Sequence, residues 1–264
     1  GARLPIGPLA AQNTLVVEGL GDYSNTGEGL HRFVDPVDQE VYLYTQFEVP
    51  DSRRMFAVFE QPDLKAAFAF TVTAPAHWAV VSNQPEDSRR TLGVVANGDN
   101  PQGVDTAVWE FTPTPRISSY ITALVAGPYA SVHSELTSAD GRTIPLGVFA
   151  RKSLMDHVDA EEMFRITKQG FEFYEAQFDT PYPFEKYDQL FVPEFNAGAM
   201  ENAGAVTFLE DYVFRSRVTK YLYERRAETV LHEMAHMWFG DLVTMRWWND
   251  LWLNESFAEW ASHW

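Results

Sequence analysis

The chain has 264 residues, and its 45% hydrophobic and 14% aromatic content is enough to bury a core, which excludes an intrinsically disordered protein. A formal net charge of −17 disfavours nucleic acids and anionic membrane surfaces as partners. The absence of cysteine excludes disulfides and cysteine-ligated metals, and no apolar run approaches the ~20 residues that span a bilayer. The absence of cysteine fits a reducing compartment but does not prove one.

The first half of the chain has the pattern of β-structure. Residues 40–50 alternate between apolar and polar side chains, which is typical of a strand with one buried face. Further strands are expected at residues 67–74, 78–82, 106–112 and 120–126, with a turn at 97–101. We therefore expect an antiparallel β domain at residues 1–143, incomplete at its start.

The second half mixes strands and helices. A strand is expected at residues 144–150, and Asp159 with Glu162 three residues later forms a capping box that begins a helix reaching about Phe178. Two strands at 188–193 and 205–209 follow, and then two helices. Residues 144–264 are thus expected to form a second domain, and the fold class is α+β.

A short loop between those two strands combines glycine with an acidic residue. Residues 195–204 read FNAGAMENAG, with Glu201 between glycines at positions 198 and 204. Glycine at such positions lets the backbone approach a ligand closely. The loop is therefore a candidate binding segment.

The most specific pattern is a pair of histidines one helical turn apart. The run His232-Glu233-Met234-Ala235-His236 puts both imidazoles on one helix face, where they can share a tetrahedral zinc ion. Glu233 is placed to act on water at the metal rather than to bind the metal. Glu255 follows after eighteen residues, on an aromatic-rich segment (247–260) predicted to be a second helix. It can supply a third ligand, or it can lie on the solvated side of that helix.

Together these runs resemble the zinc aminopeptidase N family of gluzincins, whose joint signature is GAMEN, then HExxH, then a glutamate nineteen positions after the second histidine. Shorter runs at residues 44–48, 59–65, 82–83 and 118–121 are similar to other family segments. The resemblance extends from about residue 40 to the end. It implies a zinc metallo-aminopeptidase of bacterial type, with an N-terminal β domain followed by the truncated first part of a thermolysin-like catalytic domain. Bacterial relatives with a similar acidic, cysteine-free character are usually cytoplasmic, so the resemblance also implies a cytoplasmic protein.

The resemblance implies a role for individual residues. His232, His236 and Glu255 would bind one Zn²⁺ per chain, and Glu233 would be the general base of peptide hydrolysis. Glu201 would bind the free ammonium group of a peptide substrate. The other predicted substrate-binding residues are Glu48, Gln46, Gly198, Ala199, Met200, Asn202 and Ala197.

These substrate-binding predictions differ in their basis. Glu48 would be the second partner of the ammonium group, with Gln46 on the same strand face, although a solvated strand residue is the other interpretation of Glu48. The backbone at Gly198 and Ala199 would pair with the peptide as an added strand. The small side chain of Ala197 predicts a roomy pocket for the first residue of the substrate.

Two further expectations concern the surroundings of the zinc ligands. Glu228, Asp250 and Glu259 are candidates to orient the ligands, or they are plain surface acids. The family uses a tyrosine well downstream of the third ligand to stabilise the oxyanion, whereas this chain stops nine residues after Glu255. We therefore expect an internal fragment of a longer enzyme, able to bind zinc but with reduced turnover.

Two other functions stay open. An epoxide hydrolase of the leukotriene type shares the scaffold, but that branch usually shows GGMEN, whereas position 199 is alanine here. A non-catalytic, peptide-binding scaffold of aminopeptidase type would have a degraded zinc motif, whereas the motif here is intact. The expected partners are peptides with a free N-terminus, and the sequence leaves the oligomeric state open.

Overall fold

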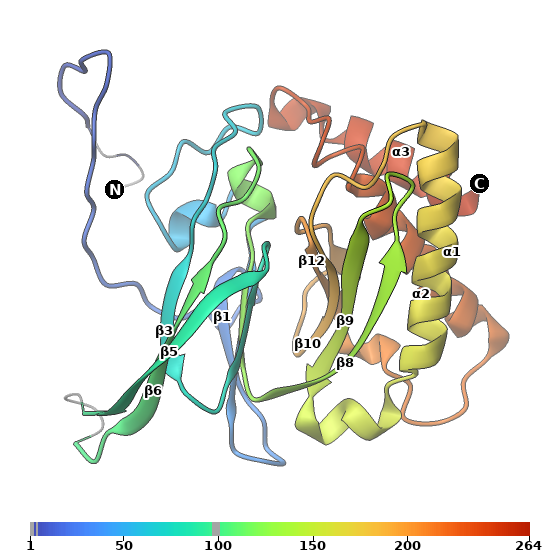
Figure 1. The fold of residues 1–264 in the computed structure, drawn as a ribbon, viewed down its shortest axis with the longest axis horizontal. Helices are drawn as coiled ribbons and strands as arrows, with labels where there is room; N and C mark the ends of the chain where they lie inside the picture. Colours follow the sequence, from blue (N-terminus) through green and yellow to red (C-terminus); the bar gives the residue numbers. More distant parts are fainter. Residues whose placement is uncertain (1–2, 4, 97–100) are drawn as a thin grey trace.

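Two sheet-containing halves lie side by side in the computed structural model, which describes residue 3 and residues 5–96 and 101–264 (Figure 1). The first half holds two antiparallel sheets, and the second holds a mixed sheet with helices packed against it. The α+β prediction is confirmed. The turn expected at residues 97–101 falls mostly outside the described residues.

Among the described residues, seven strands build the first half. The four-stranded sheet has the order β1 (Gly29–Val34), β2 (Val41–Gln46), β7 (Leu124–Gly127), β4 (Ala79–Ser82), and the three-stranded sheet has the order β3 (Thr71–Pro75), β6 (Val104–Phe111), β5 (Glu86–Val95). Every neighbouring pair is antiparallel. The predicted strands at 67–74, 78–82, 106–112 and 120–126 overlap β3, β4, β6 and β7. Strands β1 and β5 were not predicted.

The strand expected at residues 40–50 is shorter than its alternation indicates. Strand β2 ends at Gln46, and the chain turns over residues 48–50. The Gln46 side-chain oxygen accepts a hydrogen bond from the backbone N–H of Glu48 at 3.1 Å, and Pro50 has no N–H to offer to a sheet. The expectation that Gln46 and Glu48 share a strand face is therefore wrong.

The second half is built on a five-stranded sheet. Its order is β11 (Ala199–Met200), β12 (Ala205–Leu209), β10 (Tyr187–Val192), β9 (Thr143–Arg151), β8 (Tyr129–Thr137). Strands β9, β10 and β12 are parallel, whereas the two outer strands are antiparallel to their neighbours. Because β8 belongs to this sheet, we propose that the division between the halves lies near residue 128 rather than between 143 and 144.

Three helices accompany this sheet. Helix α1 (Ala160–Phe178) begins at the predicted cap, where the Asp159 side chain accepts a hydrogen bond from the Glu162 N–H. Helix α2 (Lys220–His236) packs against α1 and carries the paired histidines. Helix α3 (Trp252–His263) follows a 3-10 turn at Trp248–Asp250 and packs against α2. The helix expected at 247–260 is thus present but begins later.

The two halves share a hydrophobic core, and polar contacts cross between them. Core residues include Tyr42 and Tyr44 of the first half together with residues of the mixed sheet and of α2. The Asn83 amide donates hydrogen bonds to the carbonyls of Ile121 at 2.8 Å and of Ala203 at 2.9 Å. The first half thereby fixes the loop that carries Glu201.

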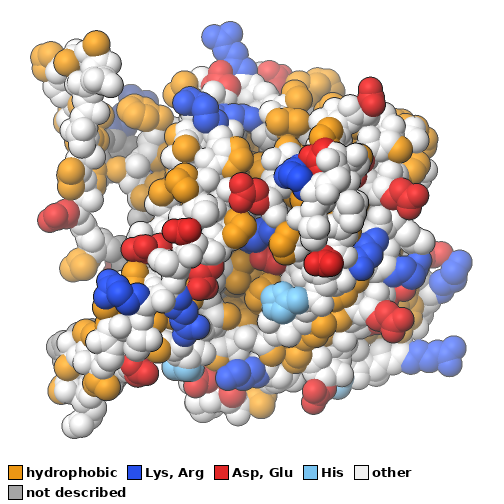
Figure 2. Space-filling view, viewed as in Figure 1, with side chains coloured by type: hydrophobic (Ala, Val, Ile, Leu, Met, Phe, Trp, Pro, Cys, Tyr) orange, Lys and Arg blue, Asp and Glu red, His pale blue; other side chains and the backbone are white. Residues whose placement is uncertain are grey.

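An extended arm precedes β1. Figure 2 shows apolar side chains along this arm, at the upper left of the molecule. The exposed large apolar residues of the arm include Ile6, Leu9, Leu15, Val16, Val17 and Leu20. Within the described part of the chain, no helix combines the length and apolar character needed to cross a membrane.

Candidate active site

The end of helix α2 and the first turn of helix α3 bring the three predicted metal ligands together. The Nε2 atoms of His232 and His236 are 3.1 Å apart. One carboxylate oxygen of Glu255 lies 3.3 Å from Nε2 of His232 and 3.7 Å from Nε2 of His236. All three donor atoms therefore face one common point.

The outer nitrogens of the two imidazoles indicate where their protons lie. Nδ1 of His236 is 3.0 Å from the backbone oxygen of Phe239, and Nδ1 of His232 is 3.4 Å from a carboxylate oxygen of Glu259. Both neighbours are acceptors, so each Nδ1 carries the hydrogen, and in a neutral ring this leaves a lone pair on Nε2. Two lone pairs and a carboxylate at this spacing repel one another unless a cation lies between them.

Zinc fits this donor set. Metal–ligand bonds of about 2.0–2.1 Å in a tetrahedron separate neighbouring ligand atoms by about 3.3 Å. The three observed separations of 3.1, 3.3 and 3.7 Å bracket that value. Two imidazoles and one carboxylate are also a ligand combination that zinc takes in catalytic sites, with one position left for water.

Two buried glutamates lie beside the metal ligands. Glu201 and Glu233 each place a carboxylate oxygen within 4.8 Å of the other's and of a His236 nitrogen. Burial, followed by the charges of neighbouring acids, raises the pKa of Glu233 well above its usual range. Burial and the charge of Glu255 raise the pKa of Glu201 to about 7. The Glu201 carboxyl can thus exchange protons near neutral pH.

A third acid completes the cluster from the first half of the chain. Oxygens of Glu48, Glu201 and Glu255 lie within 4.8 Å of one another. Burial, then the charge of Glu201, raises the pKa of Glu48 to about 8. Burial raises the pKa of Glu255, but the adjacent imidazoles of His232 and His236 lower it by more, so it lies below its usual value. The cluster therefore favours a cationic ligand.

The predicted binding loop has one exposed edge and one buried side. Strand β11 is the outermost strand of its sheet, and the Gly198 carbonyl accepts a hydrogen bond from the Leu209 N–H at 2.9 Å. Ala197 and Ala199 are half-buried, whereas Met200 packs in the hydrophobic core. The edge of β11 that faces away from β12 is where an added peptide strand would pair.

The side chains of two predicted substrate-binding residues are engaged in hydrogen bonds within the protein. The Asn202 amide donates a hydrogen bond to the Thr207 hydroxyl at 3.2 Å, and Asn202 is buried. The Gln46 side-chain oxygen accepts the hydrogen bond from the Glu48 N–H that was described with the fold. These contacts indicate that both side chains support the site through bonds within the protein rather than through direct contact with a substrate.

The acids predicted to orient the ligands divide into two groups. Glu259 contacts the outer nitrogen of His232, as a ligand-orienting residue does. Glu228 instead accepts a hydrogen bond from Arg225 at 2.9 Å, and one of its carboxylate oxygens lies 2.6 Å from Nε2 of His263. Asp250 lies in the 3-10 turn before α3.

Sequence reasoning passed over three buried polar residues next to the site. Tyr120 and Asn254 are hydrogen-bonded to each other, and Asp241 is buried with no partner among the described residues for either carboxylate oxygen. Burial and then the charge of Glu201 raise the pKa of Asp241 well above its usual range. The burial of a single polar residue leaves no pattern in the sequence. The position of Asn254 directly before Glu255 was therefore the one sequence signal that could have pointed to these residues.

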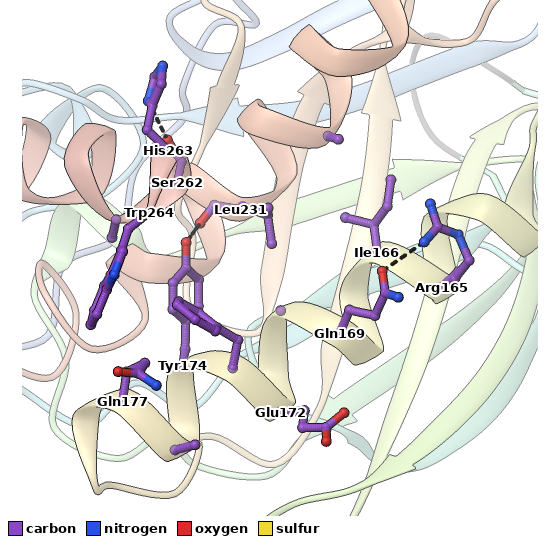
Figure 3. Close-up of a pocket in the computed structure, with 15 residues that line it drawn as sticks. Arg165, Ile166, Gln169, Glu172, Tyr174, Gln177, Leu231, Ser262, His263 and Trp264 are labelled. Carbon is purple, nitrogen blue, oxygen red and sulfur yellow. Dashed lines mark hydrogen bonds between the residues drawn. The ribbon is translucent and has the colours of Figure 1, made fainter.

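A separate hollow of about 740 Å³ lies between α1, α2 and the end of α3. Figure 3 shows its lining, in which the Tyr174 hydroxyl donates to the Leu231 carbonyl and Arg165 donates to Gln169. Trp264, at its edge, is 54% exposed and contacts the ring of Phe173. The lining is mostly apolar, and the three metal-ligand residues are not part of it.

We expect the metal-free chain to lose stability as the pH rises from about 5 to 8. The folded-state pKa values of Glu48 and Glu201, about 8 and about 7, are above the usual value of 4.5, so the folded state binds protons that the unfolded state has released. The expected loss in the free energy of unfolding is on the order of 6 kcal/mol, with the larger share from Glu48. Urea denaturation with a chelator at several pH values measures it.

A matched variant isolates the cause of this pH dependence. Glu201→Gln keeps the shape but removes the charge that burial penalises, so its unfolding midpoint at pH 8 should exceed that of the wild type and vary less with pH. Saturating Zn²⁺ should also reduce the variation. A wild-type midpoint that rises between pH 5 and 8 would contradict the argument.

The sequence of this chain matches the models of two protein domains and the sequences of known proteins. The Peptidase M1 N-terminal domain matches residues 7–121, and the Peptidase family M1 domain matches residues 162–264, a span that contains the paired histidines and Glu255. Aminopeptidase N of Streptomyces lividans is 62% identical over 255 residues, which cover 97% of this chain and 28% of the relative. Human aminopeptidase N is 33% identical over 248 residues, 92% of this chain and 24% of the relative.

The length of the relatives varies. The chain spans about a quarter of the length of the Streptomyces and mouse proteins. Aminopeptidase N of Acetobacter pasteurianus is 36% identical over 260 residues, which cover 94% of this chain and 67% of that relative. The chain therefore belongs to the M1 family of peptidases, among relatives of the aminopeptidases N.

Proposed function

We propose that the protein containing this chain is a zinc-dependent aminopeptidase, which removes the N-terminal residue from peptides in peptide catabolism. One observation carries the proposal: three metal-ligand atoms converge at tetrahedral spacing directly beside a cluster of buried carboxyls. The first feature suits hydrolysis of an amide, and the second suits recognition of a free ammonium group. The cytoplasmic location and one Zn²⁺ per chain stay predictions.

The protein's own residues divide the chemical work between them. His232, His236 and Glu255 would hold the zinc ion, which when bound supplies Lewis-acid polarisation and lowers the pKa of water. Glu233 would take a proton from the attacking water and pass it to the departing amine.

Selectivity for a free N-terminus would come from the acidic cluster. Glu48, from the first half, and Glu201, which directly follows β11, bring carboxylate oxygens within 4.8 Å of one another. An ammonium group placed there makes charge-assisted hydrogen bonds and offsets the repulsion between the acids. A peptide paired along β11 would then place its first residue at the cluster.

Metal analysis and substrate cleavage test this proposal. We expect one zinc ion per chain and cleavage of alanyl or leucyl arylamides by the whole protein. A zinc-loaded protein that ignores arylamides and oligopeptides would defeat the proposal, and hydrolysis of an aliphatic epoxide instead would favour the epoxide hydrolase. Peptide binding without turnover would favour the scaffold. We also propose that residues 1–264 alone retain zinc but cleave more slowly than the whole protein.

The Glu201 carboxylate should control the binding of the substrate's amine. We expect Glu201→Gln to lower kcat/KM for leucyl arylamide by about 10- to 100-fold, because a hydrogen bond between two charged groups contributes about 1.5–3 kcal/mol. Glu172→Gln, which changes an exposed glutamate of α1, is the matched control and should leave kcat/KM unchanged. Steady-state kinetics at pH 7 measures both. Equal kinetics for the two variants would remove Glu201 from the proposed role.

A further inference from the structure

The predicted binding loop is preceded by a residue whose backbone conformation is unfavourable for its type. Glu194 directly precedes Phe195 and has a φ of 54°, in the left-handed region that residues other than glycine rarely adopt. Such a conformation persists only where surrounding contacts hold it, and it is most common at functional sites. The contacts of Glu194 therefore set the course of the loop that follows.

Both the backbone and the side chain of Glu194 are held by the first half of the chain. The Tyr44 hydroxyl donates a hydrogen bond to the Glu194 carbonyl oxygen at 3.1 Å, and Nε2 of His31 is 3.1 Å from a carboxylate oxygen of Glu194. His31 and Tyr44 are buried and lie directly opposite each other on β1 and β2, with ring centroids 4.9 Å apart. Two neighbouring side chains thus act on one residue.

The hydrogen bonds of His31 indicate where its proton lies. The backbone N–H of Gly27, 3.0 Å from Nδ1 of His31, can only donate, so Nδ1 carries a lone pair. In a neutral ring the hydrogen is then on Nε2, which donates it to the Glu194 carboxylate. The imidazole is therefore held from both sides.

The next two residues of the loop are tied to the same region. The Phe195 ring packs edge-on against that of Tyr44, with centroids 5.4 Å apart, and the Asn196 amide donates a hydrogen bond to the carbonyl of Thr26. Ala197 follows directly, is half-buried, and is the residue predicted to leave room for the first side chain of a substrate. The first half of the chain therefore sets the position of Ala197.

We propose that Tyr44 and His31 are positioning residues that determine selectivity for the first side chain of the substrate. By holding Glu194 and the two residues after it, they fix Ala197 relative to the amine-binding carboxyls. The depth of the pocket for that side chain follows from this placement. The inference rests on the proposed function and deepens it.

The test is Tyr44→Phe in the whole protein, which removes the hydrogen bond to the Glu194 carbonyl and keeps the ring. Tyr42→Phe is the matched control, because Tyr42 is equally buried on the same strand but its hydroxyl donates to Asp38. We expect Tyr44→Phe to lower kcat/KM for leucyl arylamide about three- to tenfold, as the loss of one hydrogen bond allows. The change should lie mainly in KM, because the metal ligands and Glu233 are not on this loop. Glycyl arylamide, which places no side chain in the pocket, should lose much less.

Glu194→Ala provides a second disruption, because it removes the acceptor of the His31 hydrogen bond at an exposed position and so keeps the core intact. It should lower the ratio of kcat/KM for leucyl to that for glycyl arylamide as well, whereas Glu172→Ala on the surface of α1 should not. If Tyr44→Phe does not fold, Glu194→Ala decides alone.

An unchanged ratio in either folded variant, including an equal loss on both substrates, would overturn the inference while leaving the aminopeptidase proposal intact. The same holds for a ratio that changes equally in Tyr42→Phe. A wild-type protein that cleaves neither arylamide would instead defeat the proposed function, and the inference with it.

Discussion

Replacing Glu233 by glutamine should lower kcat about 10²–10⁴-fold while the protein still binds one zinc ion per chain. Glutamine keeps the size and the hydrogen-bonding reach of the side chain but cannot accept a proton from water. Glu233 lies beside the ligand set rather than within it, so the metal affinity should change little. Steady-state kinetics on leucyl arylamide, together with metal analysis of the same sample, measures both quantities.

The control for this experiment lies on the same helix. Glu224 is exposed and pairs only with Lys220 among the salt bridges of α2, so Glu224→Gln should retain full activity. If Glu233→Gln retained more than a tenth of the wild-type kcat, Glu233 would not be the general base. If the variant lost its zinc, the side chain would be supporting the ligands, and the assignment of roles within the cluster would change.

The second large effect concerns stability and comes from the contact between the two halves. Arg151, at the end of β9, forms ion pairs with Asp35, just after β1, and with Glu210, just after β12. All three side chains are largely buried. Arg151→Met would leave two buried carboxylates without a cationic partner. Removing one member of a buried ion pair typically costs about 3–5 kcal/mol of stability. We expect a loss of that size in the free energy of unfolding, measured by urea denaturation.

An exposed arginine provides the comparison. Arg165 pairs with Glu162 on the surface of α1, and pairs of this kind contribute about 0–1 kcal/mol, so Arg165→Met should change stability little. Adding Asp35→Asn to Arg151→Met should restore part of the loss, because it removes one stranded charge. A loss below about 1 kcal/mol for Arg151→Met would mean that water or rearrangement compensates the carboxylates.

The parts of the site that depend on local spacing were predictable from the sequence. His232, His236 and Glu255 converge because helix periodicity places the first two on one face and a second helix supplies the third. The predicted cap at Asp159 also forms. Membership of the M1 family, expected from the combined motifs, is confirmed by the matching domains.

Features that depend on tertiary contacts were not predictable. Strand β8 joins the second sheet through its pairing with β9, which no periodicity specifies, and β5 is mostly exposed and polar, so it lacks a clear apolar face. Alternation over residues 40–50 continues past the true strand end, because the hydrogen bond between Gln46 and Glu48 decides where β2 stops. The network of Tyr120 and Asn254 joins residues 134 positions apart and leaves no local pattern.

Glu48, Glu201 and Glu255, whose carboxylate oxygens lie within 4.8 Å of one another, come from three separate parts of the chain, which are the first half, the loop before β12, and α3. A cation held among them is therefore a crosslink between segments that otherwise repel one another. When a substrate's amine binds among these acids, the interface between the two halves should become more rigid and more resistant to heat and proteases. Peptides with a blocked terminus would give no such protection, so the same contacts that select a substrate would also report its presence.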